Sequence, residues 1–139
     1  MPLYLTKRNK DGTYGPTKRK HYYLPKKDHL KTARKNKDKT RWIIKEGEEY
    51  SVFKISNERW YYCSENNALY SLVDDCSQVL GENGERIAFY GERSNPSDPW
   101  HGYPIFAKKR IPSSKLLDKM VATKFISEST RIRIEKSKL

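Results

Sequence analysis

The sequence predicts an α+β fold, an antiparallel sheet of four or five strands with two helices packed on it. Two patterns lead to this prediction. Short runs rich in aromatic and β-branched residues alternate with charged turns between Arg41 and Cys63, which is typical of an antiparallel meander. After Ala68 the apolar residues change to helical spacing. Residues 1–40 show neither pattern and are expected to form an extended or partly disordered basic arm before a single domain at 41–139.

The meander is expected to supply the first three strands. They are predicted at 41–45, 50–55 and 59–63, separated by charged turns. A helix is expected next, over 68–80, because its apolar residues recur three and four positions apart while acidic and amide side chains fall on the other face. Gly81 is expected to end this helix.

A strand at 86–90, a long polar loop at 91–104 and a strand at 105–107 are expected to follow. The loop contains three prolines and two glycines, which restrict its conformations or allow tight turns. It also holds the densest group of chemically versatile side chains in the sequence. We therefore expect a rigid loop that joins two strands and carries special residues.

The C-terminal part is expected to contain a second helix. Ser113 or Ser114 would cap it, and its apolar stripe would begin at Leu116. The stretch 129–136 is ambiguous. Apolar and charged residues alternate there, which favours an edge strand, and a short basic helix is the alternative.

Composition excludes several classes of protein. The chain has 139 residues, of which 35% are hydrophobic and 33% charged, so one domain with a modest core is expected. No apolar run reaches the roughly 20 residues of a membrane span, and the N-terminus shows no secretory signal. We expect no membrane association and a cytoplasmic location, to which the two cysteines are suited. The cysteines and histidines do not form a metal-binding pattern, and we expect no metal and no cofactor.

Charge is distributed unevenly along the chain. Residues 1–41 carry 14 Lys or Arg and 3 Asp or Glu, and residues 108–139 carry 10 and 3. The stretch between them carries 5 basic and 11 acidic residues. Basic ends of this kind are typical of proteins that bind polyanions. We therefore expect RNA or another polyanion as the partner.

Tyrosines are interleaved with the cations of the arm. Aromatic rings stack on single-stranded bases while lysines and arginines neutralise phosphates, so the pattern favours a nucleic-acid-binding protein, and RNA over DNA. The predicted nucleic-acid-binding residues are Lys7, Arg8, Lys18, Arg19, Lys20, Tyr22, Tyr23, Lys26, Lys27, Arg34, Lys35, Lys108, Lys109 and Arg110.

The loop at 91–104 suggests an alternative function, a small metal-independent ribonuclease of the bacterial-toxin type. Such an enzyme needs a base for the 2′-hydroxyl, an acid for the leaving oxygen and a cation for the phosphorane charge. Glu92 or His101 would be the base, and His101 the acid. Arg93 would hold the phosphate and Tyr103 would position it. The competing interpretation is structural, with Trp100 covering the core and His101 bound to a backbone carbonyl.

A third function is open, that of a protein–protein interaction module. The acidic middle of the chain and its basic arm could contact one another, a second copy or another protein, and a ribonuclease of this type would have a protein inhibitor as a partner. Salt would weaken such an association, and RNA would leave it unchanged.

Overall fold

The computed structural model describes residues 3–26 and 40–139 as an α+β structure built on one antiparallel sheet. The strands are β1 (Tyr62–Cys63), β2 (Ala68–Ser71), β3 (Ile87–Gly91) and β4 (Tyr103–Ile105). They pair in the order β1-β2-β3-β4, with Tyr62 opposite Leu69 and Phe89 opposite Tyr103. The predicted fold class and the lower predicted number of strands are confirmed.

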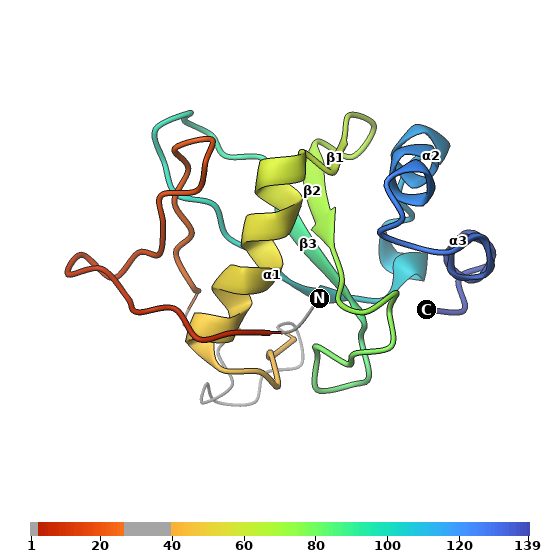
Figure 1. Cartoon of the computed structure of the whole chain (residues 1–139), viewed down its shortest axis with the longest axis horizontal. Coiled ribbons are helices and arrows are strands. Elements are labelled where there is room, and N and C mark those ends of the chain that lie inside the picture. The colour runs from red at the N-terminus through yellow and green to blue at the C-terminus, as the bar shows by residue number, and fades with distance from the viewer. Residues whose placement is uncertain (1–2, 27–39) are drawn as a thin grey trace.

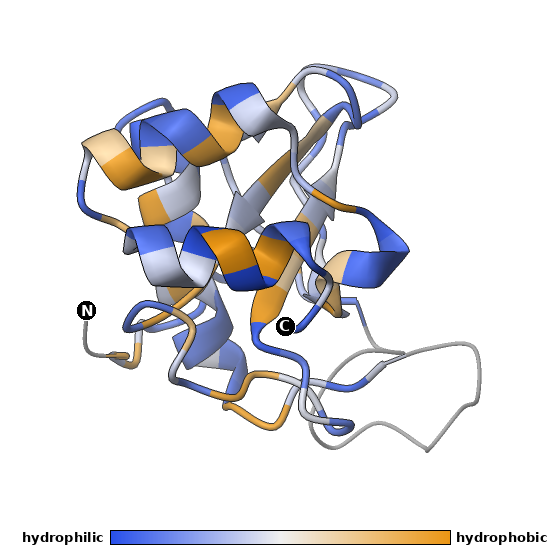
Figure 2. Cartoon of the chain, turned by 90° about the vertical axis from the view of Figure 1, so that its right-hand side faces the viewer, coloured by the Kyte–Doolittle hydropathy of each residue, from blue (hydrophilic) through white to orange (hydrophobic). Residues whose placement is uncertain are grey.

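In the described part of the chain, three α-helices cover the two faces of this sheet, where two had been predicted. They are α1 (Glu46–Arg59), α2 (Ser114–Ala122) and α3 (Glu128–Glu135), and a short 3-10 helix, η2 (Ala107–Lys109), follows β4. Helix α1 lies on one face, and α2 and α3 lie on the other (Figure 1). Figure 2 looks onto the second face, where hydrophobic and hydrophilic segments alternate along the helices.

Helix α1 replaces the predicted strand at 50–55. Three glutamates in its first turn favour the helix N-terminus, and Lys45 N–H donates to the Glu48 carboxylate at 2.9 Å. The helix is buried on most sides, so its apolar residues show no helical period. Its run of aromatic and β-branched residues was therefore mistaken for a strand.

The predicted helix at 68–80 is also wrong. Its first residues form β2, in which all four residues are buried. A strand that is buried on both faces has a continuous apolar run, and such a run can match helical spacing by chance. The chain then turns through Asp74, Asp75 and Cys76, which all have positive φ.

The C-terminal elements agree better with the sequence. The Ser113 hydroxyl accepts a hydrogen bond from Leu116 N–H at 3.2 Å and caps α2, as predicted. Residues 128–135 form the helix that was the alternative to an edge strand. Ser127 caps it by accepting from Thr130 N–H at 3.1 Å, and Ile134 is buried while Ile132 is 46% exposed.

Residues 3–26, part of the segment expected to be an arm, lie against α1 and the loop that precedes β4 (Figure 1). Tyr14 pairs with Tyr23, and Tyr23 pairs with Trp100, through isolated backbone bridges. Tyr14 and Tyr23 are buried at 4% and 0% exposure. This part of the chain therefore contributes to the core, and residues 27–39 lie outside the described residues.

Candidate nucleic-acid interface

Trp60 and Tyr62 form a stacked pair at the point where α1 ends and β1 begins. Their ring centroids are 5.1 Å apart and the ring planes differ by 14°. Trp60 is the C-cap of α1, with φ 58° and ψ 56°, a left-handed conformation that usually requires glycine. Tyr61, between them, is fully buried. We call the half-buried pair Trp60 and Tyr62 the aromatic platform.

Cations surround the aromatic platform. The Arg19 guanidinium lies 4.8 Å from the centroid of the Trp60 ring, and Lys119 Nζ donates to the Trp60 carbonyl at 2.9 Å. A groove of about 310 Å³ is lined by the platform together with Lys115 and Lys119. Burial lowers the pKa of Lys119, and the nearby Arg19 lowers it further. Arg19 and Lys119 are thus held close to one another, an arrangement that a bound anion would stabilise.

His21 lies beside the platform, with its ring centroid 6.3 Å from that of Trp60. Thr17 Oγ1 donates to Asn57 Oδ1 at 2.6 Å, so the Asn57 amide nitrogen faces His21 Nδ1 at 2.8 Å and donates to it. This network places the proton of the neutral imidazole on Nε2. Burial lowers the pKa of His21, and the neighbouring Arg93 and Arg19 lower it further, which favours the neutral form.

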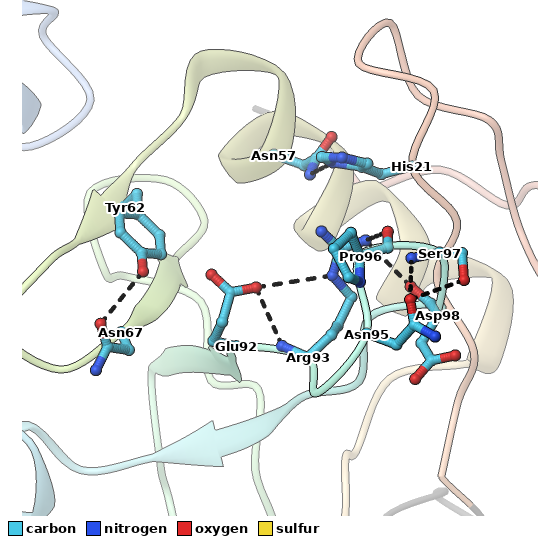
Figure 3. A network of polar contacts seen from close by, with 10 residues as sticks. All are labelled: His21, Asn57, Tyr62, Asn67, Glu92, Arg93, Asn95, Pro96, Ser97 and Asp98. Carbon is cyan, nitrogen blue, oxygen red and sulfur yellow. Dashed lines mark hydrogen bonds and ion pairs between the residues drawn. The ribbon is translucent and has the colours of Figure 1, made fainter.

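Glu92 and Arg93 complete this side of the molecule, next to His21 and Tyr62 (Figure 3). The Arg93 guanidinium lies 4.5 Å from the centroid of the Trp100 ring, and its Nη1 donates to the carbonyls of Pro96 and Asp98. The Glu92 carboxylate lies 3.8 Å from Arg93 Nε. Burial raises the pKa of Tyr62, and the Glu92 carboxylate raises it further.

The structure divides the four residues predicted for catalysis. Glu92 and Arg93 are adjacent, but His101 Nδ1 lies 2.8 Å from the Leu24 carbonyl and Tyr103 packs against Phe89 on the opposite face of the sheet. Trp100 is fully buried. These contacts match the structural interpretation of the loop, in which His101 binds a backbone carbonyl.

The bonds of this loop fasten the N-terminal segment to the domain. Trp100 N–H donates to the Tyr22 carbonyl at 2.8 Å, and Leu24 N–H donates to the Trp100 carbonyl at 2.9 Å. A Cβ at Gly102 would lie 2.0 Å from the Tyr90 ring, so only glycine fits there. The unusual composition of the loop thus has a packing explanation.

The residues predicted to bind nucleic acid fall into several places. Lys18, Arg19 and Lys20 form the tip of a turn next to α1, and Arg19 reaches the platform. Tyr22 is 40% exposed, whereas Tyr23 is buried and its hydroxyl donates to Glu49 at 2.8 Å. The Tyr23 ring is therefore not available for stacking on a base.

The remaining predicted cations lie away from the platform or outside the described residues. Lys7, Arg8 and Lys26 are exposed in the N-terminal segment. Lys108, Lys109 and Arg110 are exposed after β4, and their charged groups lie over the rings of Phe106, Tyr103 and Phe89. Lys27, Arg34 and Lys35 lie outside the described residues.

Sequence reasoning missed the aromatic platform, together with His21 and Lys119. A signal was present at the platform. The predicted strand at 59–63 places Trp60 and Tyr62 on one face and Tyr61 on the other, because alternate side chains of a strand point the same way. Lys119 and His21 gave no such signal, because only the folded chain brings α2 and the N-terminal segment to the end of α1.

Comparisons with family models, with curated proteins and with solved structures found no match for this chain. Among residues 3–26 and 40–139, no three His, Cys, Asp or Glu side chains are grouped as metal ligands would be. Within the same described ranges, none of the helices is both long enough and apolar enough to traverse a bilayer.

Proposed function

We propose that this protein binds single-stranded nucleic acid, RNA in preference to DNA, through the aromatic platform and its surrounding cations. The stacked pair of Trp60 and Tyr62 carries the proposal, because a half-buried aromatic stack beside a groove lined by lysines suits a base and its phosphate together. The strained backbone at Trp60 supports it as well, since such conformations cluster at functional sites.

The charges around the platform give the second argument. Burial lowers the pKa of Lys119, and the charge of the nearby Arg19 lowers it further. Lys115 and Lys119 line the same groove. A bound phosphate would relieve the repulsion between these cations. The formal net charge of +12 adds a longer-range attraction for polyanions.

The test is fluorescence anisotropy of a labelled RNA of about ten nucleotides, titrated with the full chain at several salt concentrations. Tyr62→Ala is expected to weaken binding roughly tenfold, because one stacked base contributes about 1–3 kcal/mol. The double variant Arg19→Gln, Lys119→Gln is expected to weaken binding and to reduce the salt slope by about 1.4, which is about 0.7 for each phosphate contact.

The matched control is Lys136→Gln, Lys138→Gln, which removes the same charge from exposed positions after α3. This control should keep nearly all of the affinity. An equal loss in both double variants would mean that only overall charge matters, and would rule out the platform as the binding site. A DNA strand of the same sequence tests the preference for RNA.

Metal-independent cleavage is a second candidate, and the observation that favours it is the position of Glu92 and Arg93 beside the platform. The same RNA is incubated with the protein in EDTA and its length is followed on a gel. Shortened products that disappear with Glu92→Gln would establish cleavage. Intact RNA in a stable complex would leave binding as the function.

A further inference from the structure

A second cavity adjoins the aromatic platform on its His21 side. It has a volume of about 250 Å³ and lies between the N-terminal segment and the loop before β4. Its lining residues include Asp11, Lys20, His21, Tyr22 and Asp98. We call it the His21 pocket. The ligand that we infer for this pocket rests on the function proposed above, because it would be part of the bound nucleic-acid strand.

The polar groups of the His21 pocket include donors and acceptors. Lys20 supplies an ammonium group, and His21 supplies Nε2–H, which has no hydrogen bond within the described residues. Asp11 Oδ1 already accepts from the Thr13 N–H at 3.0 Å and the Thr13 hydroxyl at 2.6 Å. The Asp98 carboxylate has no such bond in the described part of the chain and can accept from a ligand.

Asp98 is held in a defined position. Its N–H donates to the Asn95 carbonyl at 3.0 Å, and its carbonyl accepts from Arg93 Nη1 at 3.1 Å. Ser97 N–H donates to Asn95 Oδ1 at 3.1 Å, which closes the turn seen in Figure 3. Arg93 is itself packed on the Trp100 ring, so the turn is anchored to the core. The backbone at Asp98 is therefore fixed, and the exposed carboxylate that it carries is open to a ligand.

The pocket is lined by two carboxylates, Asp11 and Asp98, and by two cations, Lys20 and Arg93, so its formal charge is zero and it offers a phosphate no net attraction. A neutral planar group with its own donors and acceptors fits better. Tyr22, which is 40% exposed, offers a ring for stacking at the side of the pocket. These are the requirements of a nucleobase.

Among the bases, guanine matches the polar groups best. Its N1–H and its 2-amino group lie side by side and can both donate to one carboxylate, an arrangement that adenine, cytosine and uracil lack. Its O6 and N7 are acceptors for Lys20 and for the Nε2–H of His21. We propose that the His21 pocket binds a guanine, with Asp98 reading its N1–H and 2-amino group, next to the base stacked on the platform.

Short uridine oligonucleotides that carry one central guanine, adenine, cytosine or inosine test this, with the full chain and fluorescence anisotropy. The guanine oligonucleotide is expected to bind roughly tenfold more tightly than the adenine one, as a bidentate pair contributes about 1–3 kcal/mol of discrimination. Inosine, which lacks the 2-amino group, should fall between them.

Asp98→Asn is expected to abolish the preference for guanine while the affinity for the all-uridine strand stays the same. The matched control is Glu128→Gln, which removes an exposed carboxylate at the start of α3 and should keep the preference. Equal affinity for all four oligonucleotides, or a loss with Asp98→Asn that is the same for every strand, would overturn the guanine pocket and leave RNA binding standing. No binding of any strand would overturn both.

Discussion

The face of the sheet under α1 is packed with rings, whereas the face under α2 and α3 is packed mostly with aliphatic side chains. The aromatic core comprises Tyr14, Tyr23, Trp42, Ile44, Tyr50, Val52, Phe53, Leu69, Val73, Leu80, Ala88, Tyr90 and Trp100. The aliphatic core comprises Tyr61, Cys63, Ala68, Tyr70, Leu72, Cys76, Ile87, Phe89, Ile105, Ala107, Leu116, Leu117, Met120, Ile126, Ile134 and Leu139. The two cores alternate along β2 and β3, as the pleat of a strand requires.

The buried side-chain nitrogen and oxygen atoms that have no hydrogen bond all lie on the aromatic side of the described structure. They are Trp42 Nε1, Glu49 Oε2, Tyr90 Oη, Arg93 Nε and Trp100 Nε1. Such atoms weaken a core, and in native proteins they call for an explanation. The aromatic platform and the His21 pocket lie on this same side, and α2 on the opposite face supplies Lys115 and Lys119 to the groove beside the platform. Under the proposed function, the aliphatic core supplies stability, while the aromatic core gives up some stability to position the candidate site.

The largest effect is expected from the buried carboxyl of Glu49. Burial raises its pKa to about 8 from an ordinary 4.5, so the folded protein keeps a proton that the unfolded chain loses. Stability should therefore fall as pH rises from about 4.5 to about 8, by on the order of 4–5 kcal/mol, and then level off. Glu49→Gln should remove this dependence, as measured by urea unfolding across that range. An unchanged pH profile in the variant would contradict the assignment.

The aliphatic core is expected to respond next most strongly. Ile134→Ala removes a side chain of α3 that is 1% exposed and should lower the free energy of unfolding by about 3 kcal/mol. The affinity of the folded protein for RNA should stay the same, because α3 lines neither the groove beside the platform nor the His21 pocket. Urea unfolding and anisotropy measured on one preparation check both points. A parallel loss of affinity would contradict the prediction that the aliphatic core affects stability and not RNA binding.

The sequence was sufficient for the fold class and for several elements. The strand predicted at 86–90 is observed at Ile87–Gly91, and the helix predicted to be capped by Ser113 or Ser114 is capped by Ser113, because aromatic and β-branched content and capping act locally. Part of the helix at 46–59 was predicted as a strand, and the strand at 68–71 was predicted as the start of a helix. Both elements are buried on nearly every side, so neither has an amphipathic period that identifies its type.

Less of the candidate site than of the fold could be predicted from the sequence. Arg19 and Glu92 were singled out from their composition and neighbours, but their partners were not. His21 reaches the site only because residues 14–23 fold back and pair with Trp100, a contact between distant parts of the chain. The conspicuous His101 drew attention, yet its ring lies against the Leu24 carbonyl.

Trp60→Gly separates the contribution of Trp60 to stability from its contribution to RNA binding. Glycine relieves the left-handed strain at this C-cap, which contributes about 1 kcal/mol, while the loss of the ring removes packing, so the net change in stability should be small. Affinity for single-stranded RNA should fall roughly tenfold. Thermal unfolding and anisotropy provide the two measurements. A variant that is no weaker in binding would exclude Trp60 from the interface.

The smallest effect is expected from Lys108→Gln, Lys109→Gln. Both side chains are exposed after β4, and Lys109 lies over the ring of Tyr103, which packs against the aliphatic core. Their loss should weaken RNA binding less than threefold and should change the salt slope less than the loss of Arg19 and Lys119 does, because charges beyond a Debye length of about 8–10 Å are screened. A slope change as large as that of the platform double variant would extend the interface to both faces. The two cores would then no longer mark separate roles.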